Sequence, residues 1–300
     1  PKLESEESAL KYFLLGAFSS AFLFYGIALV YGGTSRTDLL GIVAAAASAP
    51  VNPVLFIIGA ALLLVGLAFK LSVVPFHMWT PDVYQGAPTP LTGWMAVSVK
   101  VAGLAALLRV FVMAFPSLAA DLSPVLAVLA GATMIVGNLA AIVQTNIKRM
   151  LAYSSIAQVG YLLMAFVPYA NARVASDAVA ATLFYMAGYA FTSFAAWAVV
   201  TAVETNEGKG LAIADYAGLG LKHPWLGAAM TIAMLSFTGI PPTLGFWGKF
   251  YIFRAAVEGG SIGLALIGLL TSVLSAYYYL RVVVTMYMKP GEPEARGETW

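Results

Sequence analysis

Three lysines lie within stretches of sequence that are otherwise apolar enough to cross a membrane: Lys70, Lys100 and Lys249. A charge near the middle of a spanning helix costs about 2.5–3.5 kcal/mol on insertion scales, so intramembrane lysines usually serve a function. A desolvated lysine can take up and release a proton near neutral pH, because burial disfavours its charged form. The three lysines therefore indicate an ion path, and the proton is the ion that an amine handles most readily.

The composition indicates an all-α polytopic membrane protein. Hydrophobic residues make up 61% of the chain and charged residues only 10%, and the mean hydropathy is +0.86. The short alternating segments of a membrane β-barrel are absent from the sequence. A net charge of +2 offers no basic patch for nucleic acid. Without cysteine the chain has no thiolate ligands for a metal or an iron–sulfur cluster, and two histidines, His77 and His223, argue against haem ligation.

About eight stretches are long enough to span the roughly 30 Å of hydrocarbon in a bilayer. They are Ala9–Tyr31, Pro53–Gln85, Thr89–Phe115, Leu122–Val143, Arg149–Val167, Val174–Val203, Pro224–Val257 and Ser261–Met288. The connection Glu204–His223 mixes charged and apolar residues, and we expect an amphipathic segment lying at the membrane surface there.

Two of these spans, Pro53–Gln85 and Pro224–Val257, are too long for one straight crossing and contain helix breakers. The breakers are Pro75 and Pro81 in the first span and Gly239, Pro241, Pro242, Gly245 and Gly248 in the second. Proline removes a backbone donor and clashes with the preceding turn, so both helices should be broken within the membrane. Broken helices in corresponding positions of two halves are typical of inverted-repeat transporters, in which the ion site lies at the break.

The distribution of basic residues predicts the orientation of the chain. If the short turn at Lys148-Arg149 is cytoplasmic, nine basic residues fall inside and four outside, as the positive-inside rule requires. Those inside are Lys2, Lys11, Lys148, Arg149, Lys209, Lys222, Arg281, Lys289 and Arg296, and those outside are Arg36, Arg109, Arg173 and Arg254. The chain begins at Pro1 without a methionine, from which we expect a piece of a longer membrane subunit; a complete protein that has lost its methionine is the alternative.

Three stretches resemble signatures of the antiporter-like membrane subunits of respiratory complex I, the proton-translocating NADH:quinone oxidoreductase. They are KLSVVPFHMWTPDVYQGAPTPLTGWMAVSVK at 70–100, IKRMLAYSSIAQVGYLLMAF at 147–166 and LSFTGIPPTLGFWGKFYIF at 235–253. Within that family, TPDVYQGAPTP is most similar to the bacterial subunit N branch. More distant relatives include membrane subunits of cation/proton antiporters and of membrane-bound hydrogenases.

The resemblance implies a fold of fourteen helices with two inverted repeats, of which this chain would supply helices six to thirteen. Residues 1–300 would form one membrane domain, with the end of the first repeat at 9–115, the second repeat at 122–288 and a polar tail at 289–300. Lys70 would pair with a glutamate on helix five, upstream of Pro1. Lys100 would be a central relay, and Lys249 would connect to the outer exit.

The resemblance also implies partners and a location. Neighbouring membrane-arm subunits and the lipid bilayer would surround the chain in a bacterial inner membrane. NADH, flavin, iron–sulfur clusters and quinone would be bound by other subunits, so this chain would have no catalytic residue, cofactor or metal of its own. A cation/proton antiporter without a redox partner is the alternative, although no carboxylate lies deep in a span to bind sodium. A structural spacer is a second alternative.

Five further residues are weaker candidates for the path: His77, Tyr153, Ser154, Ser155 and Gln158. His77 could extend the path beside Lys70 or bond to loop backbone, and the hydroxyls of residues 153–155 could carry a water wire or simply bond between helices. Gln158 stands where many relatives have histidine, and an amide could only hold a water.

Three other readings concern structure. The ammonium of Lys249 could simply satisfy carbonyls left free at the helix break. Asp82 and Asp215 are predicted to anchor loops, with a neighbouring subunit as one option for their partner. The run Tyr277–Tyr279 is predicted to form part of an aromatic belt at the membrane interface.

Overall fold

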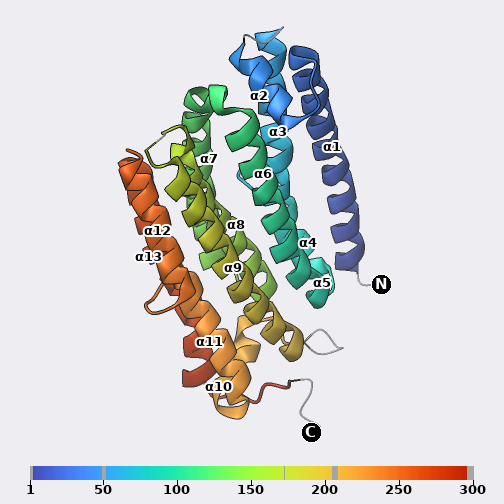
Figure 1. Cartoon of the computed structure of the whole chain (residues 1–300). Coiled ribbons are helices and arrows are strands. Elements are labelled where there is room, and N and C mark those ends of the chain that lie inside the picture. Colours follow the sequence, from blue (N-terminus) through green and yellow to red (C-terminus); the bar gives the residue numbers. More distant parts are fainter. Residues whose placement is uncertain (1–2, 49–51, 172, 205–208, 296–300) are drawn as a thin grey trace.

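The computed structural model describes residues 3–48, 52–171, 173–204 and 209–295. These residues form a bundle of long helices without any β-strand (Figure 1), which confirms the predicted fold class. Seven helices within this part of the chain are long and apolar enough to cross a membrane. Residues 205–208 of the predicted surface segment, residues 296–300 of the predicted polar tail, and Lys2 lie outside the described residues.

The long helices follow the predicted spans closely. They are α1 (Leu3–Thr34), α3 (Pro53–Leu71), α5 (Thr89–Trp94) continuing through a π-helical turn (Met95–Val99) into α6 (Lys100–Ala114), α7 (Ala119–Ile142), α8 (Ile147–Phe166), α9 (Ala175–Val203), α11 (Pro224–Thr238), α12 (Leu244–Glu258) and α13 (Ile262–Met288). The short helices are α2 (Leu39–Ala47), α4 (Trp79–Gly86), α10 (Leu219–Lys222) and 3₁₀ turns at Pro116–Leu118, Val167–Ala170 and Ile213–Tyr216.

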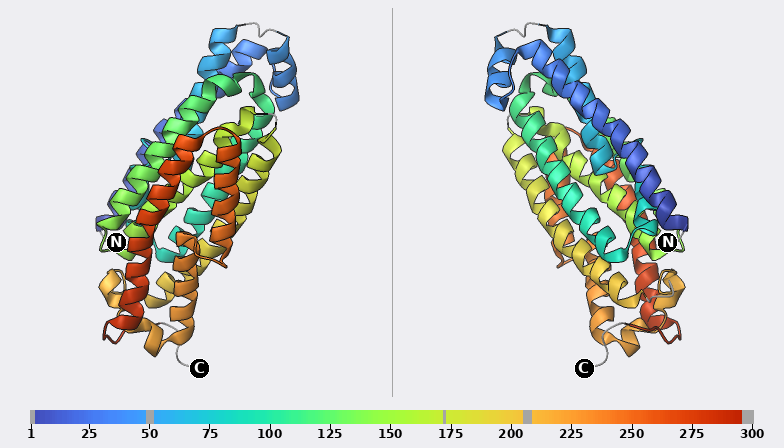
Figure 2. Two further views of the ribbon diagram at one scale, coloured as in Figure 1. Left: turned by 90° about the vertical axis from the view of Figure 1, so that its left-hand side faces the viewer. Right: turned by 90° about the vertical axis from the view of Figure 1, so that its right-hand side faces the viewer.

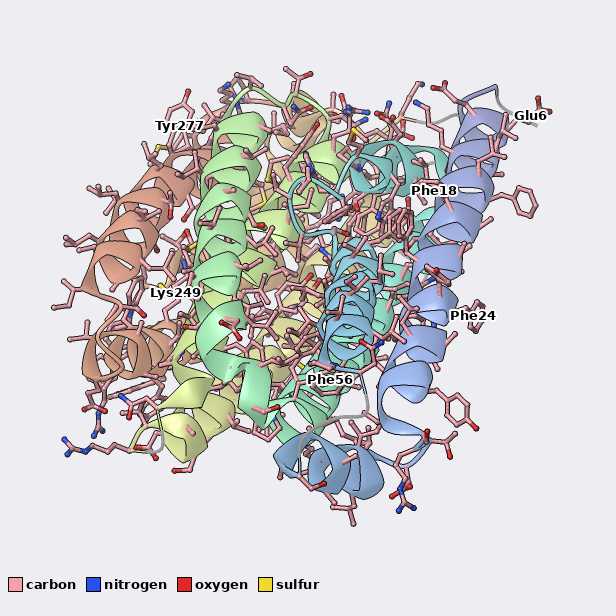
Figure 3. All side chains as sticks on the ribbon, turned by 90° about the horizontal axis from the view of Figure 1, so that it is seen from above. Glu6, Phe18, Phe24, Phe56, Lys249 and Tyr277 are labelled. Carbon is pink, nitrogen blue, oxygen red and sulfur yellow. The ribbon has the colours of Figure 1, made fainter. Side chains whose placement is uncertain are left out.

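Helix α8 forms the centre of the bundle, and α1 lies at its edge. An 18-residue window of the α8 span is 94% buried, whereas the corresponding window of α1 is only 17% buried. Figure 2 shows the long helices running side by side around this centre. The outer face of α1 is apolar, with Phe18 66% and Phe24 68% exposed (Figure 3), as a surface that meets lipid or another protein would be. Polar groups that face α8 are therefore far better shielded than those on α1.

The first predicted break is present between α3 and α4. Helix α3 ends at Leu71, Ser72 adopts a left-handed conformation with φ of 63°, and α4 begins at Trp79. Pro75 lies in this gap as predicted. Pro81 does not break the helix, because it lies in the first turn of α4, where a backbone N–H has no helical partner to lose.

The second predicted break is present between α11 and α12, each of which is 15 residues long. Gly239 caps α11 with a φ of 89°, and Pro241 and Pro242 follow it before α12 begins at Leu244. Gly245 and Gly248 were expected to help break the span but lie inside α12. A Cβ on Gly245 would lie 1.7 Å from the Ser236 carbonyl oxygen, so this glycine permits close packing of the two half-helices.

The connection between α9 and α11 contains short helical elements where an amphipathic segment is predicted. Residues 209–223 fold back under the bundle as a 3₁₀ turn and α10. Tyr216 and Leu219 are fully buried there, and Ala212 forms an isolated β-bridge with Asn146. This connection therefore closes the end of the bundle at which α8 begins.

Candidate functional site

Lys100 is buried beside an irregular turn that the sequence does not predict. The span containing it is interrupted by the π-helical turn Met95–Val99, directly before the lysine. The Tyr189 hydroxyl of α9 packs against this turn and donates a hydrogen bond to the Ala96 carbonyl at 3.1 Å. Lys100 is 3% exposed, and its Nζ donates to Ser155 Oγ of α8 at 2.6 Å. The amine thus has one close hydrogen-bond partner within the described part of the chain.

Lys249 has more hydrogen-bond partners than Lys100. It is 5% exposed, and its Nζ donates to the carbonyls of Phe237 (2.8 Å) and Thr238 (3.0 Å) and to Ser272 Oγ (2.9 Å). The two carbonyls belong to the last turn of α11, which the break leaves without helical partners. The Nζ also lies 4.7 Å from the centre of the Tyr161 ring, within the range of a cation–π contact. These contacts fit the alternative reading, in which the ammonium satisfies carbonyls left free at the break.

A buried cluster surrounds Gln158 on α8, one helical turn from the Ser155 that contacts Lys100. Gln158 Nε2 donates to Tyr279 OH at 3.0 Å and, at 3.3 Å, to the same Phe237 carbonyl that accepts from Lys249. Its Oε1 accepts from the Tyr185 hydroxyl, and Tyr279 OH is hydrogen-bonded to Ser154 Oγ. The amide therefore positions two tyrosine hydroxyls and reaches the carbonyl cap that holds Lys249.

Two residues of this cluster, Tyr185 and Tyr279, were missed by sequence reasoning. The run Tyr277–Tyr279 was expected to lie at the membrane interface, yet only Tyr277 is exposed, at 59%, and Tyr278 and Tyr279 are fully buried. Adjacent helical residues differ by about 100° in direction, so a run of three tyrosines cannot all face lipid. Tyr278 OH donates to Asn138 Oδ1 at 2.9 Å, deep in the bundle.

The weaker candidates separate into two groups. Ser154, Ser155 and Gln158 lie in the buried cluster or contact Lys100 directly. Tyr153 is only half-buried, and its hydroxyl makes no hydrogen bond within the described residues. His77 lies in the first break with a buried Nδ1 that has no hydrogen-bond partner among the described residues. The Ser155 hydroxyl donates its proton to the Ala152 carbonyl, and the Ser154 hydroxyl bonds to Tyr279. The two serine side chains are therefore not hydrogen-bonded to each other.

Lys70 stands apart from this cluster. It lies in the last turn of α3 and is half-buried, and its amine has no hydrogen bond or ion pair within the part of the chain that the structure describes. Figure 3 shows Lys249 on the opposite side of the bundle from α1, the helix that packs against α3. The structure therefore places the contacts of Lys100 and of the Lys249 cap on the same helix, α8, and leaves Lys70 without a hydrogen bond to it among the described residues.

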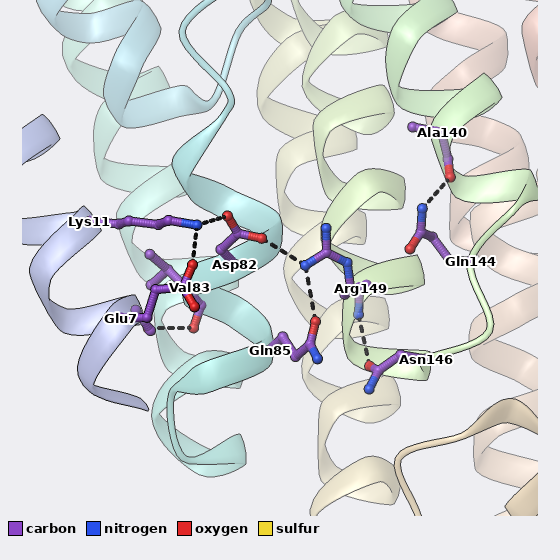
Figure 4. Close-up of polar contacts among 10 residues, drawn as sticks. Glu7, Lys11, Asp82, Val83, Gln85, Ala140, Gln144, Asn146 and Arg149 are labelled. Carbon is purple, nitrogen blue, oxygen red and sulfur yellow. Dashed lines mark hydrogen bonds and ion pairs between the residues drawn. The ribbon is translucent and has the colours of Figure 1, made fainter. Parts of the chain in front are cut away.

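At the end of the bundle where α8 begins, Asp82 joins three helices. Its carboxylate accepts from Lys11 of α1 and from Arg149 of α8, both at 2.7 Å (Figure 4). Lys11 also pairs with Glu7, and Arg149 also donates to Gln85 Oε1 at 3.0 Å. Asp82 acts as an anchor as predicted, but it lies in helix α4 and not in a loop, and its partners here are Lys11 and Arg149 of this chain. The second half of the first broken helix is thereby fixed to both α1 and α8.

Lys148 and Asp215 also act within the chain at this end. Lys148 is only 2% exposed, and its Nζ donates to the Ala87 carbonyl at 2.7 Å. The Asp215 carboxylate accepts from the backbone N–H groups of Gly210 and Ala212, both at 3.0 Å, and so anchors its loop as predicted.

Comparison with known proteins identifies the family. Residues 1–275 match the family described as NADH:quinone oxidoreductase/Mrp antiporter, transmembrane. The chain belongs to this family. It is 50% identical over 294 residues to NADH-quinone oxidoreductase subunit N of Trichlorobacter lovleyi, covering 97% of this chain and 59% of that protein. It is also 50% identical over 304 residues to NADH-quinone oxidoreductase subunit N 1 of Sorangium cellulosum, covering 97% and 59%. The chain thus spans less than two thirds of the length of these family members.

Solved structures show the same fold. A chain of respiratory complex I from Thermus thermophilus with bound aureothin matches all of this chain and 64% of its own length, with 42% identity and a TM-score of 0.83. A chain of the membrane-bound sulfane sulfur reductase, an archaeal respiratory membrane complex, matches with 31% identity and a TM-score of 0.88, covering 100% of this chain and 60% of that chain. The predicted antiporter-like fold is confirmed for this multi-pass membrane protein.

Proposed function

We propose that this chain acts as a proton-translocating membrane-arm subunit of an NADH:quinone oxidoreductase. The observation that carries the proposal is the set of buried polar groups along α8, where Ser155 contacts Lys100 and Gln158 reaches the carbonyl cap that holds Lys249. Amines, hydroxyls and an amide from several helices gather there around α8, the most deeply buried span of an apolar bundle. Intramembrane ionisable groups of this kind mark ion and proton pathways. The similarity to subunit N proteins supports the same assignment.

In the proposed path, a proton on Lys100 passes to the Ser155 hydroxyl, with which the amine already shares a hydrogen bond. A hydroxyl can accept one proton and donate another, so Ser154 and Tyr279 can continue the transfer, whereas the Gln158 amide only holds their geometry. The missing steps, from Ser155 to Ser154 and from Tyr279 to Lys249, require a water molecule or a hydroxyl rotation. Tyr153 has no part in this path, and His77 belongs to the entry side near Lys70.

We propose that Lys70 controls entry to the path. Its amine has no partner among the described residues, so a carboxylate on another helix that approaches or leaves would change how strongly it holds a proton. Moving one charge against 100 mV costs about 2.3 kcal/mol, which the pairing of an amine with a carboxylate inside a membrane can supply. In this scheme Lys249 releases the proton on the far side of the membrane.

The remaining assignments follow from the same proposal. NADH, flavin, iron–sulfur clusters and quinone would be bound by other subunits, and neighbouring membrane-arm subunits would contact this chain. The protein would lie in a bacterial inner membrane with the Lys148-Arg149 turn on the cytoplasmic side. The alternative is a subunit of a membrane-bound hydrogenase or of a cation/proton antiporter. The likeness to a chain of the sulfane sulfur reductase is consistent with a parent complex that uses another electron acceptor.

Reconstituting the assembled parent complex into proteoliposomes tests the proposal. Proton uptake per NADH oxidised should fall when Lys100 is replaced by alanine, while NADH oxidation in detergent continues. Sodium should have no effect on proton movement. Sodium-dependent proton flux without an electron donor would instead favour the antiporter, and an unchanged proton count in the Lys100→Ala variant would overturn the path.

A further inference from the structure

A cleft of about 390 Å³ lies between α9 and α12, on the outward surface of the bundle and away from the three lysines. It is lined by small and aromatic side chains and by three charged side chains, whose end of the cleft we call its mouth. The lining residues are Asp177, Ala180, Ala181, Phe184, Tyr251, Arg254, Ala255 and Glu258. None of these residues belongs to the proposed proton path.

The charged residues of the cleft all lie at one end of the helices that form it. Asp177 is in the first turn of α9, and Glu258 is the last residue of α12. Phe184 and Tyr251 each lie seven residues further into their helices, which places them about 10 Å deeper along the axis. The two rings pack edge to face with their centres 5.5 Å apart. The cleft is therefore charged where a spanning helix meets the headgroups of a bilayer and apolar where it meets the acyl chains.

The charges at the mouth are one cation between two anions. Arg254 Nε donates to Glu258 Oε1 at 2.8 Å, which leaves the other guanidinium N–H donors available. The Asp177 carboxylate has no hydrogen bond or ion pair within the described residues. A guanidinium binds phosphate oxygens in a bidentate manner, and two carboxylates on either side of it suit a primary ammonium.

From this arrangement we propose that the cleft binds a zwitterionic phospholipid with a primary amine, phosphatidylethanolamine. Its phosphate contacts Arg254, its ammonium lies between Asp177 and Glu258, and one acyl chain runs along Phe184 and Tyr251. Phosphatidylcholine has no N–H donor for the carboxylates, so it should bind more weakly. Phosphatidylglycerol would bring an anion without a cation to a site with two carboxylates, so it should bind most weakly.

Native mass spectrometry of the purified chain in detergent, with each of the three lipids added at equal concentration, measures this preference. Phosphatidylethanolamine should be retained best. Arg254→Gln should weaken its binding about tenfold, because a hydrogen bond to a charged group is lost. The matched control is Arg109→Gln, which removes another exposed arginine, on α6, and should leave binding unchanged.

A second variant tests the role of the two carboxylates. Replacing both Asp177 and Glu258 by their amides should abolish the preference for phosphatidylethanolamine over phosphatidylglycerol, because only the phosphate contact remains. Equal retention of all three lipids by the unmodified chain would overturn the proposal. So would undiminished binding in Arg254→Gln, or an equal loss in Arg109→Gln. This result is independent of proton translocation, because none of these residues lies on the proposed path.

Discussion

The two broken helices carry one lysine each, but they use it in opposite ways. At the second break, Lys249 follows the gap and its ammonium closes the end of α11 by binding the Phe237 and Thr238 carbonyls. At the first break, Lys70 precedes the gap and neutral groups join the two halves. Trp79 Nε1 donates to the Phe69 carbonyl at 3.0 Å, and Thr80 Oγ1 donates to Ser72 Oγ at 2.6 Å.

Because of this difference, the lysine contributes to the stability of the fold at the second break only. At the second break one amine is both a structural cap and a proposed proton carrier. At the first break the structural contacts come from other side chains, so the Lys70 amine remains available to a partner. Substitution of Lys249 should therefore lower both the stability of the fold and proton transport. Substitution of Lys70 should lower proton transport alone.

The largest effect should come from Lys249→Ala. It removes the proposed proton carrier and the closest donor to two buried carbonyls, which keep only longer bonds from Gln158 (3.3 Å) and Ser272 (3.5 Å). Each lost hydrogen bond to a charged group costs about 1.5–3 kcal/mol. Proton uptake by proteoliposomes should be lost, and the thermal unfolding midpoint of the purified chain should drop. A variant that fails to pump but unfolds at the normal temperature would show that the carbonyls do not need the amine.

Lys70→Ala should produce the transport defect without the loss of stability. Removing an amine that has no partner among the described residues breaks no hydrogen bond there, and the span becomes more apolar. We expect strongly reduced proton uptake per NADH in the assembled complex and an unfolding midpoint no lower than that of the unmodified chain. A destabilisation as large as that of Lys249→Ala would contradict the comparison.

Lys100→Arg should impair proton uptake as severely as Lys100→Ala. A relay must give up its proton, and a guanidinium remains protonated far above neutral pH. Near-normal pumping by the arginine variant would mean that Lys100 acts as a fixed charge. The control is Arg109→Lys, which exchanges the same two residue types at an exposed position of the same helix.

The smallest effect should come from Trp79→Phe at the first break. The ring keeps much of its packing, but the hydrogen bond to the Phe69 carbonyl is lost, which should destabilise the chain by about 1 kcal/mol. Denaturant unfolding of the purified chain measures this change, and proton uptake should be nearly normal. A severe pumping defect would show that the junction of α3 and α4 takes part in coupling.

The sequence predicted the breaks because proline and glycine act locally. Pro75 and the run Gly239–Pro242 disfavour a continuous helix through their own backbone, and the three lysines stand out against apolar neighbours. Pro81 was misjudged because its effect depends on where a helix begins, and that start is fixed by the packing of Trp79. Gly245 and Gly248 were misjudged because close helix packing selects glycine as strongly as a break does.

Other features could not be predicted because they depend on distant contacts. Nothing within Met95–Val99 distinguishes a π-helical turn from an ordinary helix; its hydrogen-bonding partner Tyr189 comes from α9. The burial of Tyr279 depends on which face of α13 meets α8, a choice that three consecutive tyrosines do not reveal. The Asp82 cluster likewise joins residues that are more than 60 positions apart.

The π-helical turn before Lys100 holds one residue more than an ordinary α-helical turn would. If the turn were rewound as an ordinary α-helix, the two parts of the helix would rotate relative to each other by about 100° and shift by about 1.5 Å. Lys100 would then leave Ser155 and face a different neighbouring helix, with no change of rotamer and no break in the backbone. In the proposed path, such a change in a single turn would determine which neighbouring helix receives the proton from Lys100.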